Sequence, residues 1–110
     1  MAKKLSDNFR VTPWSGRQHP TLSTVVTLLR QQNYRPYHWE NTANYRYPVR
    51  THNYRKMFYV IEGSVDVSFP DDNAVIRLRP GDRIEIAPNV RHSIQVGING
   101  VRCVEVALPR

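Results

Sequence analysis

Two stretches decide the fold, MFYVIEGSVDVSF at residues 57–69 and LRPGDRIEIAPNVRHSI at residues 78–94. Both contain short runs of β-branched and aromatic residues with a period of two, as in VDVSF and RIEI. That period is typical of strands that bury one face. We therefore expect neighbouring antiparallel strands in this half of the chain.

Turn residues separate these runs. Glu62-Gly63 suits a tight hairpin, and PDDN at 70–73 supplies the Asp and Asn that favour turns. Pro80 and Gly81 stand at the two central positions of a type II turn. These turns predict a succession of short strands.

The pattern begins at Tyr34 and recurs about every eight to twelve positions, which indicates an all-β sandwich or barrel. We predict strands near 34–41, 45–51, 55–62, 64–69, 74–79, 83–87, 90–96 and 101–108.

Before this region the sequence predicts one helix, over residues 20–32. Leu22, Val25, Val26 and Leu29 follow the helical i, i+3, i+4, i+7 pattern, with Asn33 as a C-terminal cap. Residues 1–19 lack periodicity and predict an N-terminal arm, which leaves 20–110 as the β-domain. A chain of 110 residues is the size of a single domain.

Cysteine usage and hydropathy restrict the class of protein. Cys103 is alone, so an intrachain disulfide and a cysteine-rich zinc site are excluded. No window approaches the ~18 to 20 apolar residues that span a bilayer, so we expect no membrane segment. We expect a soluble, cytoplasmic protein.

The charge is strongly basic, with 16 Lys+Arg against 9 Asp+Glu, and 13 of the cations are Arg. Arginine suits carboxylate and phosphate partners, so the excess favours acidic partners. The cations are also scattered over the whole chain, which is more typical of a surface charged for solubility. The expected partner is a small anionic or polar molecule inside the barrel. The segment NYRYPVRTHNYRK at 44–56 alternates cations with tyrosines, as single-stranded nucleic-acid sites do. No recognition motif accompanies it, so nucleic acid is not the expected partner.

The spacing of four residues resembles that of the cupins, which are small antiparallel jelly-roll barrels of the RmlC-like type. Their two motifs can be written G-x5-H-x-H-x3-E-x6-G and G-x5-P-x-G-x2-H-x3-N. Placing Gly63 at the end of the first motif puts His52 on its second histidine, without a gap. Placing Gly81 at the start of the second puts His92 on its histidine. The resemblance implies a cupin barrel preceded by a short N-terminal helix, and a homodimer.

The resemblance also implies a metal site, but the sequence departs from it. The four ligand positions of the family read Arg50, His52, Lys56 and His92. Neither Arg nor protonated Lys has a lone pair to give, and two histidines are too few for a transition metal. The motif glycines, proline and asparagine are replaced by Asn44, Asn89, Ala87 and Val96.

Three interpretations of these residues stay open. In the first, an anion pocket is formed by Arg50, His52, Tyr54, Lys56 and His92. In the second, His52 and His92 hold a weakly bound divalent metal (Zn, Ni, Mn or Fe) in an enzyme of oxygenase or isomerase type, with a third ligand from His38, Glu40, Cys103 or Glu105. In the third, both histidines are hydrogen-bonded interior residues.

A set of aromatic residues gives a further hypothesis. These residues could line the mouth of a cavity for a flat ligand, although aromatic residues on strands are more often core or dimer contacts. They are Tyr34, Tyr37, Trp39, Tyr45 and Tyr47.

Overall fold

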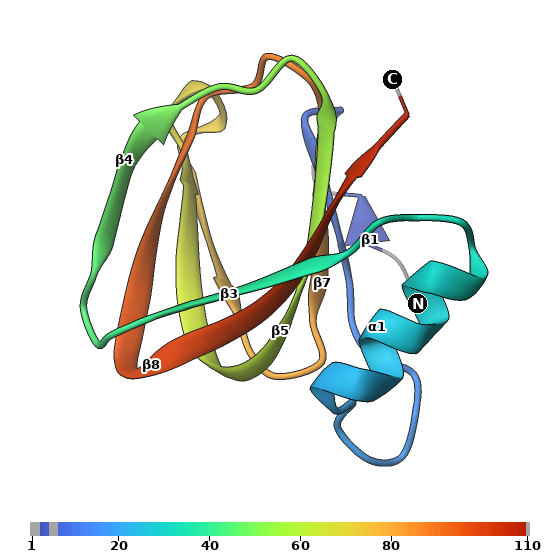
Figure 1. The fold of residues 1–110 in the computed structure, drawn as a ribbon. Helices are drawn as coiled ribbons and strands as arrows, with labels where there is room; N and C mark the ends of the chain where they lie inside the picture. The colour runs from blue at the N-terminus through green and yellow to red at the C-terminus, as the bar shows by residue number, and fades with distance from the viewer. Residues whose placement is uncertain (1–2, 5–6, 110) are drawn as a thin grey trace.

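The computed structural model describes residues 3–4 and 7–109, and it is built mainly from antiparallel strands (Figure 1). This confirms the predicted all-β fold. The strands are β1 (Lys3–Lys4), β2 (Phe9–Thr12), β3 (Tyr37–Asn41), β4 (Arg46–Arg50), β5 (Arg55–Phe69), β6 (Ala74–Leu78), β7 (Arg83–Ile86) and β8 (His92–Leu108). Two helices complete the described part, α1 (Leu22–Gln31) and the short 3-10 helix η1 (Pro70–Asp72).

All the described strands belong to one eight-stranded sheet, whose two parts on either side of the bulges in β5 are called here the first and the second sheet. The long strands β5 and β8 pair with each other along most of their length. Their Arg55–Val60 and Cys103–Leu108 halves join β7 and β3 in the first sheet, which β2 and β1 extend. Their other halves join β6 and β4 in the second sheet. The main core lies between the two sheets.

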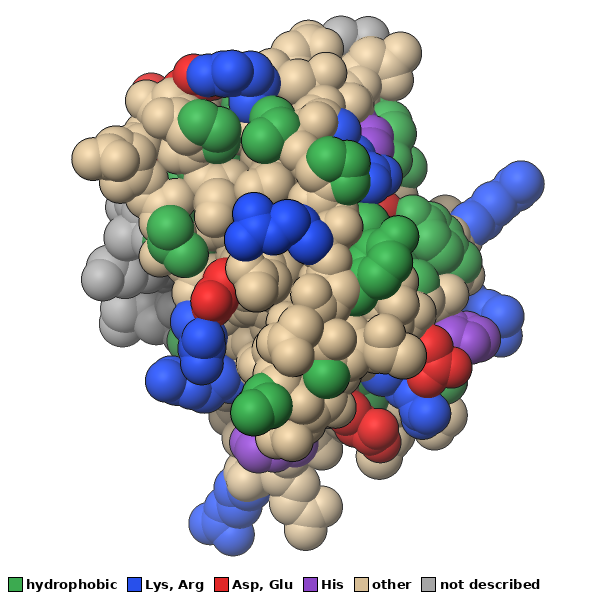
Figure 2. Space-filling model, turned by 90° about the vertical axis from the view of Figure 1, so that its left-hand side faces the viewer, with side chains coloured by type: hydrophobic (Ala, Val, Ile, Leu, Met, Phe, Trp, Pro, Cys, Tyr) green, Lys and Arg blue, Asp and Glu red, His purple; other side chains and the backbone are tan. Residues whose placement is uncertain are grey.

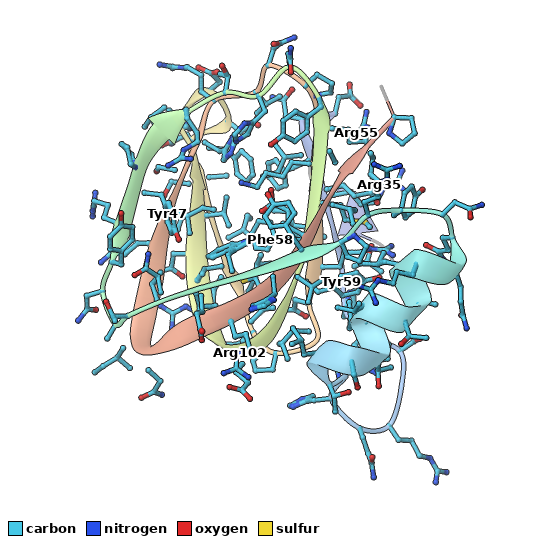
Figure 3. The ribbon with its side chains drawn as sticks, viewed as in Figure 1. Arg35, Tyr47, Arg55, Phe58, Tyr59 and Arg102 are labelled. Carbon is cyan, nitrogen blue, oxygen red and sulfur yellow. The ribbon has the colours of Figure 1, made fainter. Side chains whose placement is uncertain are left out.

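The first half of β5 is buried on both faces because each face meets a different core. Phe58 and Val60 belong to the core inside the barrel. Met57 and Tyr59 face outward, where α1 covers them with Val25 and Leu29 in a second cluster. Figure 3 shows Phe58 within the barrel and Tyr59 on the side of the helix.

The ends of α1 are capped by the chemistry of their own residues. The Thr21 hydroxyl accepts a hydrogen bond from the Thr24 backbone N–H at 3.1 Å. At the other end Asn33 has a φ of 67°, and the backbone N–H of Tyr34 donates to the Leu29 carbonyl at 3.0 Å. This is a Schellman-type ending, in which Asn33 stands one position after the C-cap.

One predicted hairpin is wrong. Residues 62–63 form no turn, because β5 runs without interruption from Arg55 to Phe69. Gly63 has a φ of 77° and lies beside register shifts in the pairing with β8, so it sits at a bulge that bends the strand. The predicted strands 90–96 and 101–108 are likewise one continuous strand, β8.

The predicted type II turn is present. The Asp82 N–H donates to the Arg79 carbonyl at 2.9 Å, and Gly81 has a φ of 95°. The Asp82 side chain also accepts from the Arg79 N–H at 2.9 Å.

The segment that we expected to be an arm contributes a strand to the barrel. Residues Phe9–Thr12 pair with β7 as β2. Phe9 is buried in the main core and stacks on Phe69, with 4.0 Å between ring centroids. β2 is short, so its sequence pattern was too weak for the strand to be predicted.

Within the described ranges, no helix has the length and apolar character that crossing a membrane requires. Figure 2 shows the face that carries β4, on which Lys and Arg side chains are dispersed among hydrophobic, acidic and other polar ones.

Candidate ligand-binding cavity

A cavity of about 330 Å³ opens at one end of the barrel. It receives side chains from both sheets: β3, the start of β5 and the end of β8 from the first, and β4 and the start of β8 from the second. The lining residues are Tyr37, Trp39, Tyr47, Pro48, Arg50, His52, Tyr54, Lys56, His92, Ile94 and Glu105.

The cavity contains all five residues that the sequence predicted for a ligand site, namely Arg50, His52, Tyr54, Lys56 and His92. They do not share one regular strand, because residues 51–54 form a loop between β4 and β5. The His52 carbonyl in this loop accepts a hydrogen bond from the Asn89 N–H at 2.7 Å. Asn89 has a φ of 65°, so it adopts the conformation that the motif's glycine would.

His92 is the most buried polar side chain of the cavity, with 1% of its surface exposed. Its Nδ1 lies 2.9 Å from the Val90 carbonyl, so in the neutral ring Nδ1 carries the hydrogen and donates it. Burial lowers the pKa of His92 to about 4, and the charges of Lys56 and Arg50 add to the effect. The ring is therefore neutral at pH 7.

His52 lies beside His92, with 5.4 Å between the ring centroids. Burial, and then the charge of Lys56, lower the pKa of His52 as well. The Nε2 atoms of both rings are buried and have no hydrogen-bond partner among the described residues.

Glu105 organises the opposite wall of the cavity. Its carboxylate, which is 3% exposed, accepts hydrogen bonds from the Tyr37 hydroxyl and, at 2.9 Å, from the Trp39 indole N–H. The Lys56 Nζ lies 3.6 Å from the same carboxylate. Burial and this carboxylate raise the pKa of Tyr37, so its hydroxyl stays protonated. Burial lowers the pKa of Lys56, and Glu105 opposes that shift.

Arg50 is the exposed cation at the mouth of the cavity. Its guanidinium carbon lies 5.4 Å from the centroid of the Tyr47 ring, a cation–π contact. Within the described part of the chain, no carboxylate forms an ion pair with Arg50, whereas Lys56 is paired with Glu105. One positive charge is therefore left without a counter-charge.

The donor set does not fit the metal centre of the cupin motifs. Within residues 3–4 and 7–109, no group of three His, Cys, Asp or Glu side chains could hold a metal ion. Of the four third ligands considered from the sequence, only Glu105 lines the cavity, and its oxygens already accept from Tyr37 and Trp39. Cys103 is buried in the main core.

Three of the five predicted aromatic residues, Tyr37, Trp39 and Tyr47, line the cavity. Tyr34 packs instead against the cluster under α1, and Tyr45 is exposed. The sequence reasoning missed Pro48 and Ile94, and it missed that Glu105 orients the aromatic residues. The period of two in β8 places Glu105 on the same face as the inward Cys103, so the sequence could have indicated that Glu105 lines the cavity.

Solved structures support the class of fold. The polyketide cyclase RemF from Streptomyces resistomycificus is 27% identical over 67% of this chain and 53% of its own, with a TM-score of 0.62. A cupin-2 domain protein from Shewanella frigidimarina is 20% identical over 70% and 71%, with a TM-score of 0.58. A cupin superfamily protein from Desulfitobacterium hafniense is 14% identical over 100% and 75%, with a TM-score of 0.59.

This chain has the fold of the small cupins, as the motif spacing predicted. The match spans only about half the length of the cyclase. No family model matches the chain, and no curated protein matches it.

Proposed function

We propose that the protein binds a small organic anion in the barrel cavity, with the acidic group of the ligand at Arg50. The observation that carries this proposal is the imbalance of charge. Arg50 and Lys56 line one cavity with a single carboxylate, Glu105, which is already paired with Lys56. A carboxylate on the ligand would neutralise the remaining charge through the planar donors of Arg50.

The size and lining of the cavity support a small ligand with an apolar body. Its volume, about 330 Å³, is at the low end of the range of small-molecule sites. Trp39 and Tyr47 pack edge to face, with 5.5 Å between ring centroids, and form an aromatic wall.

Titration calorimetry with benzoate, at pH 7 and low ionic strength, tests the proposal. We expect binding that weakens as salt is added, because Arg50 is exposed to the solvent. Arg50→Gln should weaken it by about tenfold or more, the usual scale of a charge-assisted hydrogen bond. The control is Arg46→Gln on the same strand, which removes the same charge from outside the cavity. Equal effects of the two variants, or no binding of benzoate, would contradict the proposal.

The second candidate is a metal-dependent enzyme, the alternative drawn from the sequence. The unpartnered Nε2 atoms of His52 and His92 in one cavity favour it, as does the similarity to a polyketide cyclase. The donor set argues against it, because catalytic zinc sites normally have three protein ligands. Metal analysis of the purified protein separates the candidates: a stoichiometric, tightly held metal ion would favour the enzyme.

A further inference from the structure

Two buried ring nitrogens in the cavity are not used by the proposed anion contact at Arg50. These are the Nε2 atoms of His52 and His92, buried without a partner among the described residues. The Nδ1 of His92 already donates to the Val90 carbonyl, so its Nε2 carries a lone pair. A buried polar atom without a partner is costly, and a donor on the ligand would satisfy it.

The cavity therefore offers two different kinds of contact. Arg50 at the mouth attracts an anion, whereas the buried Nε2 of His92 accepts a hydrogen bond. Arg50 and His92 are directly paired in the register of β4 and β8, so their side chains leave the same face of the sheet side by side. Arg50 is exposed to the solvent, whereas His92 is buried.

The aromatic part of the cavity lining is held in place, with the Trp39 and Tyr47 rings inclined at 73° to each other. The Trp39 indole N–H donates to Glu105, and the Trp39 ring packs against Phe58 at 5.7 Å and Tyr47 at 5.5 Å between centroids. Tyr37 is fixed by the same carboxylate. A wall of oriented aromatic rings favours a planar, aromatic ligand over a flexible aliphatic one.

We propose that the ligand is a hydroxylated aromatic carboxylate. Its carboxylate binds Arg50, its ring lies against Trp39 and Tyr47, and its phenolic hydroxyl donates to the Nε2 of His92 or His52. This inference rests on the proposed function and deepens it, because it adds the requirement for a donor that a simple organic anion lacks.

The test compares ligands that differ only in that donor. Calorimetry at pH 7 measures the affinities of benzoate, 3- and 4-hydroxybenzoate, and the corresponding methoxybenzoates. A methoxy group keeps the oxygen but removes the hydrogen. Comparing each hydroxybenzoate with its methyl ether therefore measures the effect of the donated hydrogen bond on affinity. We expect at least one hydroxybenzoate to bind about tenfold more tightly than both benzoate and its own methyl ether.

Variants then assign the acceptor. His92→Phe and His52→Phe remove the Nε2 atoms, and we expect one of them to abolish the preference for the hydroxyl, measured as the ratio of the hydroxybenzoate and benzoate affinities of the same variant. His38→Phe, on β3 and outside the cavity lining, should keep the preference. If a variant fails to fold, the comparison of ligands on the unaltered protein still decides.

The outcomes distinguish the two proposals. If benzoate binds through Arg50 but no hydroxybenzoate gains affinity, the requirement for a donor is wrong and the proposed function stands. If neither class of ligand binds, both are wrong. A hydroxyl preference that survives both histidine variants would also overturn this inference.

Discussion

Arg50 on β4 lies directly opposite His92 on β8 in the sheet register, and both side chains line the same cavity. The residues stand at two positions that are metal ligands in the cupin motifs, and one of the two is a cation in this chain. Within one small cavity, Arg50 therefore supplies a positive charge and His92 supplies a hydrogen-bond acceptor.

The paired substitution Arg50→His with Lys56→Glu rebuilds the four-residue ligand set of the cupin motifs. We expect the affinity for zinc or nickel to rise by orders of magnitude, because cations are replaced by lone-pair donors and repulsion becomes attraction. Calorimetry and metal analysis measure the change, with Arg46→His as a control on the same strand. Tight stoichiometric metal in the unaltered protein, without a gain in the double variant, would show that the ligands come from elsewhere.

Glu105 should matter for stability because its buried carboxylate accepts hydrogen bonds from Tyr37 and Trp39 and pairs with the buried Lys56. Glu105→Gln leaves Lys56 buried without its anion, so we expect a loss of about 3 kcal/mol in the free energy of unfolding. Adding Lys56→Met should restore part of that loss. Urea denaturation of the two single variants and the double variant measures the coupling, and strictly additive effects would contradict the pairing.

We expect the free energy of unfolding to decrease as the pH is lowered from 6.5 toward 4, because the fold holds His92 neutral. Its pKa is lowered from 6.5 to about 4, so between these values the unfolded chain binds a proton that the folded protein does not. The contribution is complete above pH 6.5 and is lost as the pH falls toward 4. The groups that face the ring are Lys56, His52 and Arg50.

Urea denaturation across pH 4 to 7 checks this for the protein and for His92→Asn, which cannot titrate. We expect the free energy of unfolding to fall more steeply for the unaltered protein. Parallel pH dependences would mean that His92 is not held neutral by the fold.

Gly63 should tolerate no side chain. A Cβ atom there would lie 1.9 Å from the Gly100 carbonyl oxygen, and the φ of 77° adds strain. Gly100→Ala is the matched control, because Gly100 has the same φ but its nearest neighbour would be 3.1 Å away. We expect about 1–2 kcal/mol of destabilisation for the control and more for Gly63→Ala, measured by thermal unfolding. Equal losses would mean that the clash relaxes freely.

Assembly stays a prediction from the sequence. Sheet edges invite pairing, and β4 at the edge of the second sheet exposes Tyr45 beside it and Val49 on it. We expect a homodimer, with the mass of two chains by light scattering at micromolar concentration. A single-chain mass would refute this.

The period of two, the helical spacing of residues 22–29 and the motif spacing were enough to predict the barrel, the helix and part of the lining of the cavity. They failed at Gly63, because a glycine with positive φ serves a hairpin and a bulge equally well and only the partner strand decides. They failed at Phe9, where a short strand depends on a distant stack with Phe69.

The period of two in β8 indicates that Glu105 faces inward, but its hydrogen-bond partners could not be predicted. Its partners Tyr37, Trp39 and Lys56 come from two other strands, and local patterns contain no information on such a meeting. The sequence suggested a free carboxylate as a metal ligand, whereas the structure shows one that is already satisfied.

Because β5 and β8 run through both sheets, a ligand in the cavity affects the motion of both sheets. His92 lies at the start of β8 in the second sheet, and Glu105 lies near its end in the first. A ligand that contacts both Arg50 and the aromatic residues bonded to Glu105 therefore connects the two sheets at the open end of the barrel. It should slow amide hydrogen exchange in β3 and β4 together, although neither strand pairs with the other.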